Sequence, residues 1–294
     1  MINFLKYKKL FFSLSLLFIL PSAYFLIRFG LKPSVDFTGG TLLELQLIPL
    51  IEQEVTRQTV LDLAKDDLEI TSLQTSKDNV FIIRAPVISQ EEVSKFEEKL
   101  QGHFKEVNEL RFESVGPTLG KELIQKTLIG VLIATTFILF YVATRFKDKK
   151  YGVCAILAML HDTFILIGTF SFLGVYFNVE VDALFVTAVL TILSFSVHDT
   201  IVVYDRIRES IAQNPKMPFP DVVNKAITET LGRSVNNSLT IIFMLLSLYL
   251  LGGETTKWFV FALLIGTISG TYSSTFTAAP LLVLWEELRA KKGK

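Results

Sequence analysis

The sequence predicts a polytopic α-helical membrane protein with six transmembrane helices and an α+β domain inserted outside the membrane. Half of its 294 residues are hydrophobic and its formal net charge is zero, yet the charged residues are concentrated between long apolar segments. Runs of about 18 to 25 apolar residues are long enough to cross a hydrocarbon core of roughly 30 Å. Six such segments occur, at Leu10–Ile27, Leu123–Phe146, Tyr151–Val175, Val181–Tyr204, Ser234–Leu251 and Trp258–Leu284. The lipid bilayer is therefore expected to organise most of the chain.

The first apolar segment has features of both a signal peptide and a membrane anchor. It has a basic start, an apolar middle and small residues at Ser22 and Ala23, as a cleaved signal peptide would. However, the apolar run continues to Ile27, and Pro21 stands where a small residue is expected. We therefore expect an uncleaved anchor. The single cysteine, Cys154, lies within the third apolar segment, so no disulfide is expected in this chain.

Lysine and arginine are concentrated in alternate connections between the apolar segments. They precede the first segment, join the second to the third and the fourth to the fifth, and end the chain. The opposite short connections, "GVYFNVEVD" and "GGETT", contain acidic residues and no basic ones. Because basic loops are retained in the cytoplasm, both termini are expected there, and the long segment from Gly30 to Glu122 is expected outside.

The region 31–120 is predicted to be a small α+β domain. Its strands are expected at Thr41–Leu47, Leu68–Leu73, Val80–Arg84 and Glu106–Ser114, and its helices at Ile51–Ala64 and Gln90–Leu100. The resulting order βαββαβ is typical of a ferredoxin-like domain. The pattern contains no catalytic cluster, and the isolated His103 is expected at the surface. A docking or recognition module is therefore favoured over an enzyme domain.

The remaining regions are assigned by their apolar segments and charges. Residues 1–30 contain the cytoplasmic N-terminus and the first helix, residues 121–285 the other five helices, and residues 286–294 a basic cytoplasmic tail. Within the bundle, residues 207–232 contain a proline-rich loop followed by an amphipathic pattern. This segment is interpreted either as a connector along the membrane surface or as a contact site for a cytoplasmic or membrane partner.

Few ionisable residues occur within the apolar segments. Asp162 lies near the middle of the third, Asp199 in the inner half of the fourth with His198 before it, and Arg233 just before the fifth. Such groups are costly in a bilayer and usually face a bundle interior or an aqueous path. One interpretation is a proton relay in which a contact between Asp199 and Arg233 opens and closes. The other is that Asp162 and Asp199 are polar contacts between helices.

Six motifs follow one another along the chain and carry a family resemblance. They are "VDFTGG" (Val35–Gly40), "SVGPTLG" (Ser114–Gly120), "MLHDTFILIG" in the third span, "SVHDTIVVYDRIRE" in the fourth, "TLGRSVNNSLT" (Thr230–Thr240) and "GTISGTYSSTFTAAPLL" (Gly266–Leu282). In this order and on this topology, the sequence resembles the SecF side of the SecD/SecF family of bacterial protein-export membrane proteins, within the resistance-nodulation-division (RND) superfamily.

The resemblance implies a multi-pass subunit of the bacterial inner membrane that pairs with SecD and assists the SecYEG channel. Such a subunit couples inward proton flow to the late movement of a preprotein. The fold implied is half of an RND-type transporter, so the SecD half is expected from another chain. The family's proton-pathway aspartate falls on Asp199 and its basic partner on Arg233, while Asp162 matches the third-span motif without a defined role. His198 replaces an asparagine found in many relatives, and is a local partner, a proton relay or a neutral hydrogen-bonding substitute.

The glycines of these motifs are interpreted as structural. Gly39 and Gly40 permit a tight turn of positive φ, Asp36 is expected to cap that turn, and Gly116 and Pro117 belong to the motif before the second span. Gly266, Gly270, Ser274 and Ala278 lie four residues apart on one face of the sixth span, where small residues allow helices to approach closely. That face is expected to contact the fourth span or SecD. The alternative is lipid-facing packing inside this subunit alone.

Three classes of function are consistent with these patterns. The first is the proton-coupled export subunit, the second is an RND-type half-transporter for a lipid or small molecule, and the third is a non-conducting assembly factor. The sequence contains no phosphate-binding loop, no nucleophile and base pair and no strong metal-ligand pattern. Two histidines and two aspartates make a weak metal site. We therefore expect no enzymatic activity, no cofactor, no metal and no nucleic-acid partner.

Overall fold

The computed structural model describes residues 3–50, 56–65, 68–75, 79–146 and 148–292, which divide into two compact units. The residues up to Lys32 and from Ile129 onward form a helical unit, and Pro33–Leu128 forms the other unit. Six helical segments of the described residues are long and apolar enough to cross a membrane. They are Phe4–Phe29, Pro117–Arg145, Lys149–Phe177, Ala183–Gln213, Phe219–Leu251 and Thr255–Lys291.

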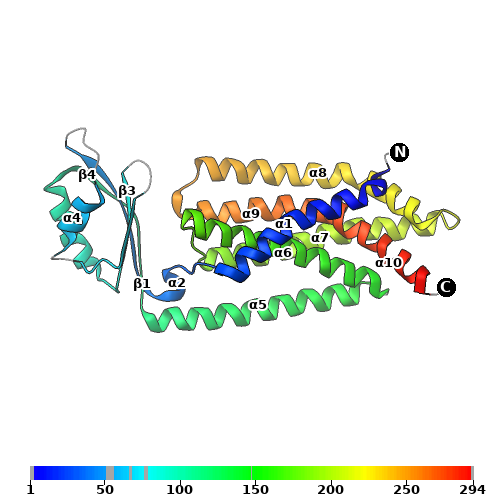
Figure 1. Ribbon diagram of the computed structural model, residues 1–294, viewed down its shortest axis with the longest axis horizontal. Coiled ribbons are helices and arrows are strands. Elements are labelled where there is room, and N and C mark those ends of the chain that lie inside the picture. The colour runs from blue at the N-terminus through cyan, green and yellow to red at the C-terminus, as the bar shows by residue number, and fades with distance from the viewer. Residues whose placement is uncertain (1–2, 51–55, 66–67, 76–78, 147, 293–294) are drawn as a thin grey trace. The chain divides into compact units, whose positions relative to one another are not determined.

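The helical unit packs its helices side by side (Figure 1). Its elements are η1 (Phe4–Tyr7), α1 (Lys8–Phe29), α5 (Pro117–Arg145, from Ile129), α6 (Lys149–Phe177), α7 (Ala183–Gln213), α8 (Phe219–Leu251), α9 (Glu254–Ser273), the π-helical turn η2 (Ser274–Ala278) and α10 (Ala279–Lys292). Helices α6, α7 and α9 contact one another, α1 lies on α6, and α8 lies on α7 and α9. About half of the most apolar window is buried in the spans that contain α6, α7 and α9, against 17% or less in those that contain α1, α5 and α8. The three central helices therefore form the core of this unit.

Local sequence signals fix the ends of the central helices. Asp148 caps α6, since its side chain accepts from the backbone N–H of Lys150, and Asp182 caps α7 by accepting from that of Phe185 at 2.7 Å. Helix α6 ends at Asn178, which adopts the left-handed conformation typical of helix C-termini.

Glycines bring the helices of this unit into close contact. A Cβ added at Gly266 of α9 would lie 2.3 Å from Ile192 of α7, and one at Gly270 would lie 3.3 Å from Phe195. The small-residue face of the sixth span therefore packs on the fourth span. A Cβ at Gly168 of α6 would lie 2.4 Å from the Cα atom of Ser22, so α1 approaches α6 equally closely.

Helix α8 begins fifteen residues earlier than the apolar segment that predicted it, and it is continuous to Leu251. Val222, Val223, Ala226 and Ile227, on the apolar face of the amphipathic pattern, are buried inside the helical unit. Asn224 in this part of the helix accepts a hydrogen bond from the backbone N–H of Phe4 at 2.7 Å. The amphipathic part of the segment is therefore not a separate connector but is continuous with the fifth apolar helix.

The second unit is an antiparallel sheet with the order β2-β3-β1-β4. Its elements are α2 (Val35–Thr38), β1 (Gly40–Pro49), α3 (Arg57–Ala64), β2 (Ser72–Thr75), β3 (Val80–Ala85), α4 (Gln90–Gln101) and β4 (Phe104–Val115). The βαββαβ order and this pairing confirm the ferredoxin-like prediction. Strand β2 begins later than expected, and residues 51–55 of the expected first helix lie outside the described residues.

The core of the second unit follows the periodicity of its strands and helices. Leu43, Leu45 and Leu47 alternate along β1 and are at most 1% exposed, and Phe96 and Leu100 of α4 cover the same face. A capping box fixes the start of α4, in which the hydroxyl of Ser89 and the carboxylate of Glu92 bind each other's backbone N–H.

Two sequence motifs of the second unit meet at one turn. Gly39 and Gly40 have φ values of +73° and +107°, as a positive-φ turn requires. A Cβ at Gly39 would lie 2.9 Å from the Cα atom of Pro117, and one at Gly120 would lie 3.0 Å from the carbonyl oxygen of Phe37. "VDFTGG" and "SVGPTLG" therefore pack on each other. The side chain that caps the short helix α2 is that of Ser34, which accepts from the N–H of Asp36 at 3.3 Å.

Candidate functional site: two buried carboxylates

The carboxylate of Asp162 is enclosed at the centre of the helical unit. The residue is 0% exposed on α6. Its Oδ1 accepts a hydrogen bond from Ser269 at 2.7 Å, and its Oδ2 accepts from Ser196 at 2.6 Å and from Ser273 at 2.5 Å. These serines belong to α7 and α9, so one acid joins the three central helices. A buried charge is tolerated only when its hydrogen-bonding capacity is met in this way.

Asp199 lies on α7 and is 8% exposed. The hydroxyl of Ser234 on α8 lies 2.9 Å from its Oδ1 and 2.8 Å from its Oδ2, and the hydroxyl of Ser274 donates to Oδ2. Since a hydroxyl has a single hydrogen, Ser234 divides one donor between two oxygens. Asp199 therefore has fewer donors than Asp162.

The serine pair Ser273 and Ser274 stands where α9 passes into the π-helical turn η2. The two residues are adjacent, yet one binds Asp162 and the other binds Asp199. Single π-helical turns within longer helices are frequent at functional sites. The close approach of α9 to α7 at Gly266 and Gly270 places both serines within reach of the acids.

His161 adds a second polar group beside Asp162. Its side chain is 4% exposed, and its Nδ1 lies 2.9 Å from Oδ1 of Asp162. Its ring stacks on Tyr272 with centroids 6.2 Å apart, and Tyr272 donates to the backbone carbonyl of Phe11 in α1 at 2.7 Å. The buried Nε2 of His161 has no hydrogen-bond partner among the described residues.

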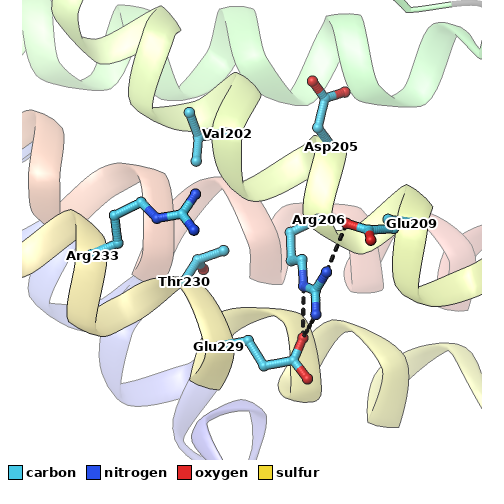
Figure 2. A pocket seen from close by; sticks show the side chains of 7 residues that line it. All are labelled: Val202, Asp205, Arg206, Glu209, Glu229, Thr230 and Arg233. Carbon is cyan, nitrogen blue, oxygen red and sulfur yellow. Dashed lines mark hydrogen bonds and ion pairs between the residues drawn. The ribbon is translucent and has the colours of Figure 1, made fainter.

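The predicted contact between Asp199 and Arg233 is not present in the described structure. Successive residues of an α-helix differ in direction by about 100°, and it is Ser234 that faces Asp199. Arg233 is exposed and lines a cavity of about 440 Å³ together with Val202, Asp205, Arg206, Glu209, Glu229 and Thr230. Figure 2 shows its guanidinium pointing toward this cavity from α8.

The cavity is rich in charges, and most of them are paired. Arg206 contacts Glu229 at 2.6 Å and Glu209 at 2.7 Å (Figure 2), and Asp205 is bound by Arg145 and Arg208. No hydrogen bond or ion pair is found for Arg233 within the described part of the chain. Val202 follows Asp199 by one turn on α7, so the cavity begins one turn from the acid, toward the basic end of the helix.

His198 is exposed on α7 and takes no part in the buried polar cluster. This position follows from the helix, because Asp199 faces inward and the preceding residue points about a quarter-turn away. Among the described residues, no group of three or more His, Cys, Asp or Glu side chains could hold a metal ion.

The serines were not identified as site residues from the sequence. Ser274 was noted only as a small residue on the packing face of the sixth span, and Ser234 adjoins the arginine that was chosen instead. The available signal was the spacing of Ser269 and Ser273, which are four residues apart and so share a helix face. Polar side chains at helical spacing within an apolar span predict a buried acceptor opposite them.

The comparisons with known proteins identify the family of the chain. The family model "Protein export membrane protein SecD/SecF, C-terminal" matches residues 95–288, and the model "SecD/SecF GG Motif" matches residues 24–47. The chain belongs to the SecD/SecF family. Both the turn at Gly39 and Gly40 and the two buried carboxylates lie within the matched regions.

Members of the SecD/SecF family are similar to this chain over nearly its full length. The protein translocase subunit SecF of Thermobaculum terrenum is 43% identical over 299 residues, covering 97% of this chain and 94% of that protein. The protein translocase subunit SecF of Anaerolinea thermophila is 40% identical with the same coverage. The crystal structure of SecDF from Thermus thermophilus matches with a TM-score of 0.83 and 33% identity. That match covers 97% of this chain but 39% of the SecDF chain, so this chain spans about two fifths of it.

Proposed function

We propose that this chain pairs with a SecD-type chain and couples inward proton movement to a late stage of protein export across the bacterial inner membrane. The observation that carries the proposal is the presence of two carboxylates, Asp162 and Asp199, buried among the central helices of a six-span bundle. Ionisable groups are costly to bury in a membrane, and those that occur there commonly mark ion or proton pathways.

The pairing is supported by the SecDF relatives, in which a region similar to this chain is one part of a longer polypeptide. It is also supported by α1, α5 and α8, because at most 17% of the most apolar window of each of these spans is buried in this chain. These surfaces are available to lipid and to a second membrane chain. In this proposal the SecD-type chain completes the transporter, and the complex serves the SecYEG channel and its preprotein.

Asp199 is the proton carrier in this proposal. It has fewer hydrogen-bond donors than Asp162, and it lies one turn from the charged cavity at the basic ends of α7 and α8. The proton arrives from the outer side, binds the carboxylate and leaves through the cavity to the cytoplasm. Arg233 lines this cavity, where its positive charge attracts the ionised carboxylate.

Protonation provides the driving step because it changes what holds the helices together. The ionised Asp199 binds α8 through Ser234 and the η2 turn through Ser274 by charge-assisted hydrogen bonds, which are about twice as strong as neutral ones. A neutral acid holds both elements less strongly. The helices then re-pack, and α1 and α5, which are joined to the second unit along the chain, carry the change outward.

The test is preprotein transport into inverted inner-membrane vesicles with and without an imposed proton gradient. Asp199→Asn keeps the size of the side chain but cannot titrate, so it should abolish the gradient-dependent increment and leave ATP-driven transport and pairing with the SecD-type chain intact. His198→Asn, at the exposed neighbouring position, should leave both unchanged.

Two results would contradict the proposal. A full gradient response in the assembled Asp199→Asn complex would favour a non-conducting assembly factor. A gradient-driven flux of lipid or small molecule that Asp199→Asn removes, with preprotein transport unaffected, would favour a half-transporter.

A further inference from the structure

The π-helical turn η2 is attached to the rest of the bundle at both of its ends. At its start, Ser273 binds Asp162 on α6 and Ser274 binds Asp199 on α7. At its end, the carbonyl of Ala278 accepts a hydrogen bond from the hydroxyl of Tyr204 at 2.9 Å, and Tyr204 is fully buried on α7. This hydrogen bond attaches the end of the turn to α7.

The same turn also contacts α1. The ring of Phe276 lies 4.6 Å from that of Phe11, centroid to centroid, and the hydroxyl of Thr277 lies 3.2 Å from that of Ser15. The turn therefore joins both acidic residues to the helix that precedes the second unit in the chain.

Each serine of the pair has a second acceptor within its own helix. The hydroxyl of Ser274 lies 3.1 Å from the carbonyl oxygen of Thr271, and that of Ser273 lies 3.2 Å from the carbonyl oxygen of Gly270. For Ser234, the described structure gives only the two oxygens of Asp199 as acceptors. Ser273 and Ser274 can therefore change acceptor by rotation of the hydroxyl alone. The described structure shows no second residue that accepts a hydrogen bond from Ser234.

Protonation of Asp199 on Oδ2 requires Ser274 to change its acceptor. An ionised carboxylate only accepts hydrogen bonds, whereas a protonated one carries an O–H that must itself donate. If the proton binds Oδ2, the hydroxyl hydrogen of Ser274 and the acid proton compete for the same space. The hydrogen of Ser274 then turns to the carbonyl of Thr271, and the oxygen of Ser274 accepts from the acid.

We propose that Ser274 is a positioning residue that converts protonation of Asp199 into a rearrangement of the η2 turn. Rotation of its hydroxyl adds a hydrogen bond to the Thr271 carbonyl, and the turn re-packs between its attachments at Tyr204 and at α1. Ser273 stays on Asp162 and acts as the fixed end. The inference rests on the proposed function, because it takes Asp199 as the group that receives the proton.

The surroundings of Asp199 limit the groups that could compete for this role. The ionisable side chains on the helices that contact α7 include Asp162 and His161 on α6, Arg233 and Glu229 on α8, and Tyr272 on α9. None of these side chains has a hydrogen bond to Asp199. Among the described residues, the side chains that bind Asp199 are those of Ser234 and Ser274.

The test compares Ser274→Ala with Thr275→Val in the full complex with the SecD-type chain. Thr275 is the next residue of the turn, is 1% exposed, and has a hydroxyl without a partner among the described residues. Both variants remove one buried hydroxyl, but only Ser274→Ala removes a donor to Asp199. The first measurement is the gradient-dependent increment of preprotein transport. The second is the carboxyl C=O band of Asp199 in pH-difference infrared spectra, assigned by its loss in Asp199→Asn.

Ser274→Ala should reduce the gradient-dependent increment about tenfold or more, the size expected for losing a hydrogen bond to a charged group. It should also shift the C=O band and its pH midpoint, which a role in packing alone would not do. Thr275→Val should leave both measurements unchanged. If Ser274→Ala does not assemble, Ser274→Cys replaces it, since a thiol of similar size is only a weak donor.

Unchanged transport and an unchanged band in the Ser274 variant would overturn the inference, as would an equal loss in Thr275→Val. Failure of the proposed function looks different: Asp199→Asn would itself keep the full gradient response.

Discussion

Ser274 binds Asp199 across 75 positions of sequence, while the adjacent Ser273 binds Asp162. Two neighbouring residues of one span thus hold carboxylates on two other spans. Because both serines belong to one turn, a rearrangement at Asp199 takes place relative to the contact with Asp162, so the acids are structurally linked.

Arg233 is expected to act without touching Asp199. Arg233→Ala should remove most of the gradient-dependent transport, because the positive charge at the exit cavity is lost, yet it should leave the infrared band of Asp199 in place. Arg208→Ala is the matched control, since Arg208 pairs with Asp205 at 3.2 Å and does not line the cavity. A shifted Asp199 band in Arg233→Ala would mean that the two side chains bind each other directly.

Gly266→Ala should destabilise the helical unit by about 1–3 kcal/mol, the usual cost of overpacking. The added Cβ would lie 2.3 Å from a side-chain carbon of Ile192. Because the obstacle is a side chain, Ile192→Ala in the same molecule should restore part of the loss. Gly130→Ala, where no atom lies within 4 Å, is the control and should be neutral or slightly stabilising. Thermal unfolding of the purified complex measures all three variants, and equal midpoints for Gly266→Ala and Gly130→Ala would refute this packing.

The second unit should fold when it is expressed alone. Residues 33–116 contain all four strands and a core of their own, with no cysteine. We expect a circular dichroism spectrum of mixed helix and strand and a cooperative urea transition. A spectrum of random coil at neutral pH would contradict this expectation.

The stability of that domain should depend on Glu97. Burial in α4 raises the pKa of Glu97 above its ordinary value of 4.5, and the neighbouring charge of Glu109 raises it further. A carboxyl whose pKa is raised by folding contributes stability below its unfolded pKa and loses that contribution as the pH rises through the folded pKa. The urea midpoint should therefore increase as the pH falls from 7 toward 4.5.

Glu97→Gln tests the cause of this dependence. The amide cannot ionise, so the variant should be more stable than wild type at pH 7 and less dependent on pH between 7 and 4.5. Glu98→Gln, one position further along α4, serves as the control. If Glu97→Gln and Glu98→Gln have the same pH profile, burial of Glu97 is not the source of the effect.

The topology can be read with single cysteines, because Cys154 is buried. A cysteine in place of the exposed Lys216, between α7 and α8, should react with a membrane-impermeant maleimide only in inverted vesicles. A cysteine in place of the exposed His103 should react only in intact spheroplasts. Labelling of the cysteine at position 216 in intact spheroplasts would show that the basic loops are not cytoplasmic.

The elements that the sequence predicted well are those set by periodicity and length. Apolar runs of membrane-spanning length predicted the number of membrane-spanning helices, and the alternation along β1 and β3 predicted strands of the sheet. The continuity of the amphipathic segment with the fifth apolar segment was missed because the two differ in composition. The apolar residues of the first half of α8 are buried by α7 and η1, so the helix needs no uniformly apolar sequence there.

The site was only partly predictable for a geometric reason. A rare acid within a span is a clear signal, and both Asp162 and Asp199 were found. Which neighbour faces the acid depends on helix rotation, and one residue changes the direction by about 100°. That step separates Ser234 from Arg233. The π-helical turn, which places Ser273 and Ser274 on different acids, has no signature in the hydrophobic pattern.

The close contact of α1 with α6 has a consequence for biogenesis. The hydroxyl of Ser171 donates to the carbonyl of Gly30 across 141 residues, and Gly168 leaves no room between the two helices at Ser22. At a synthesis rate of about 5–20 residues per second, the first helix waits roughly 7–28 s in the bilayer before its partner is made. During that time Ser15 and Ser22, buried in the finished protein, face lipid or the insertion machinery. A protein that binds the first helix during this stage would favour correct assembly of the nascent chain.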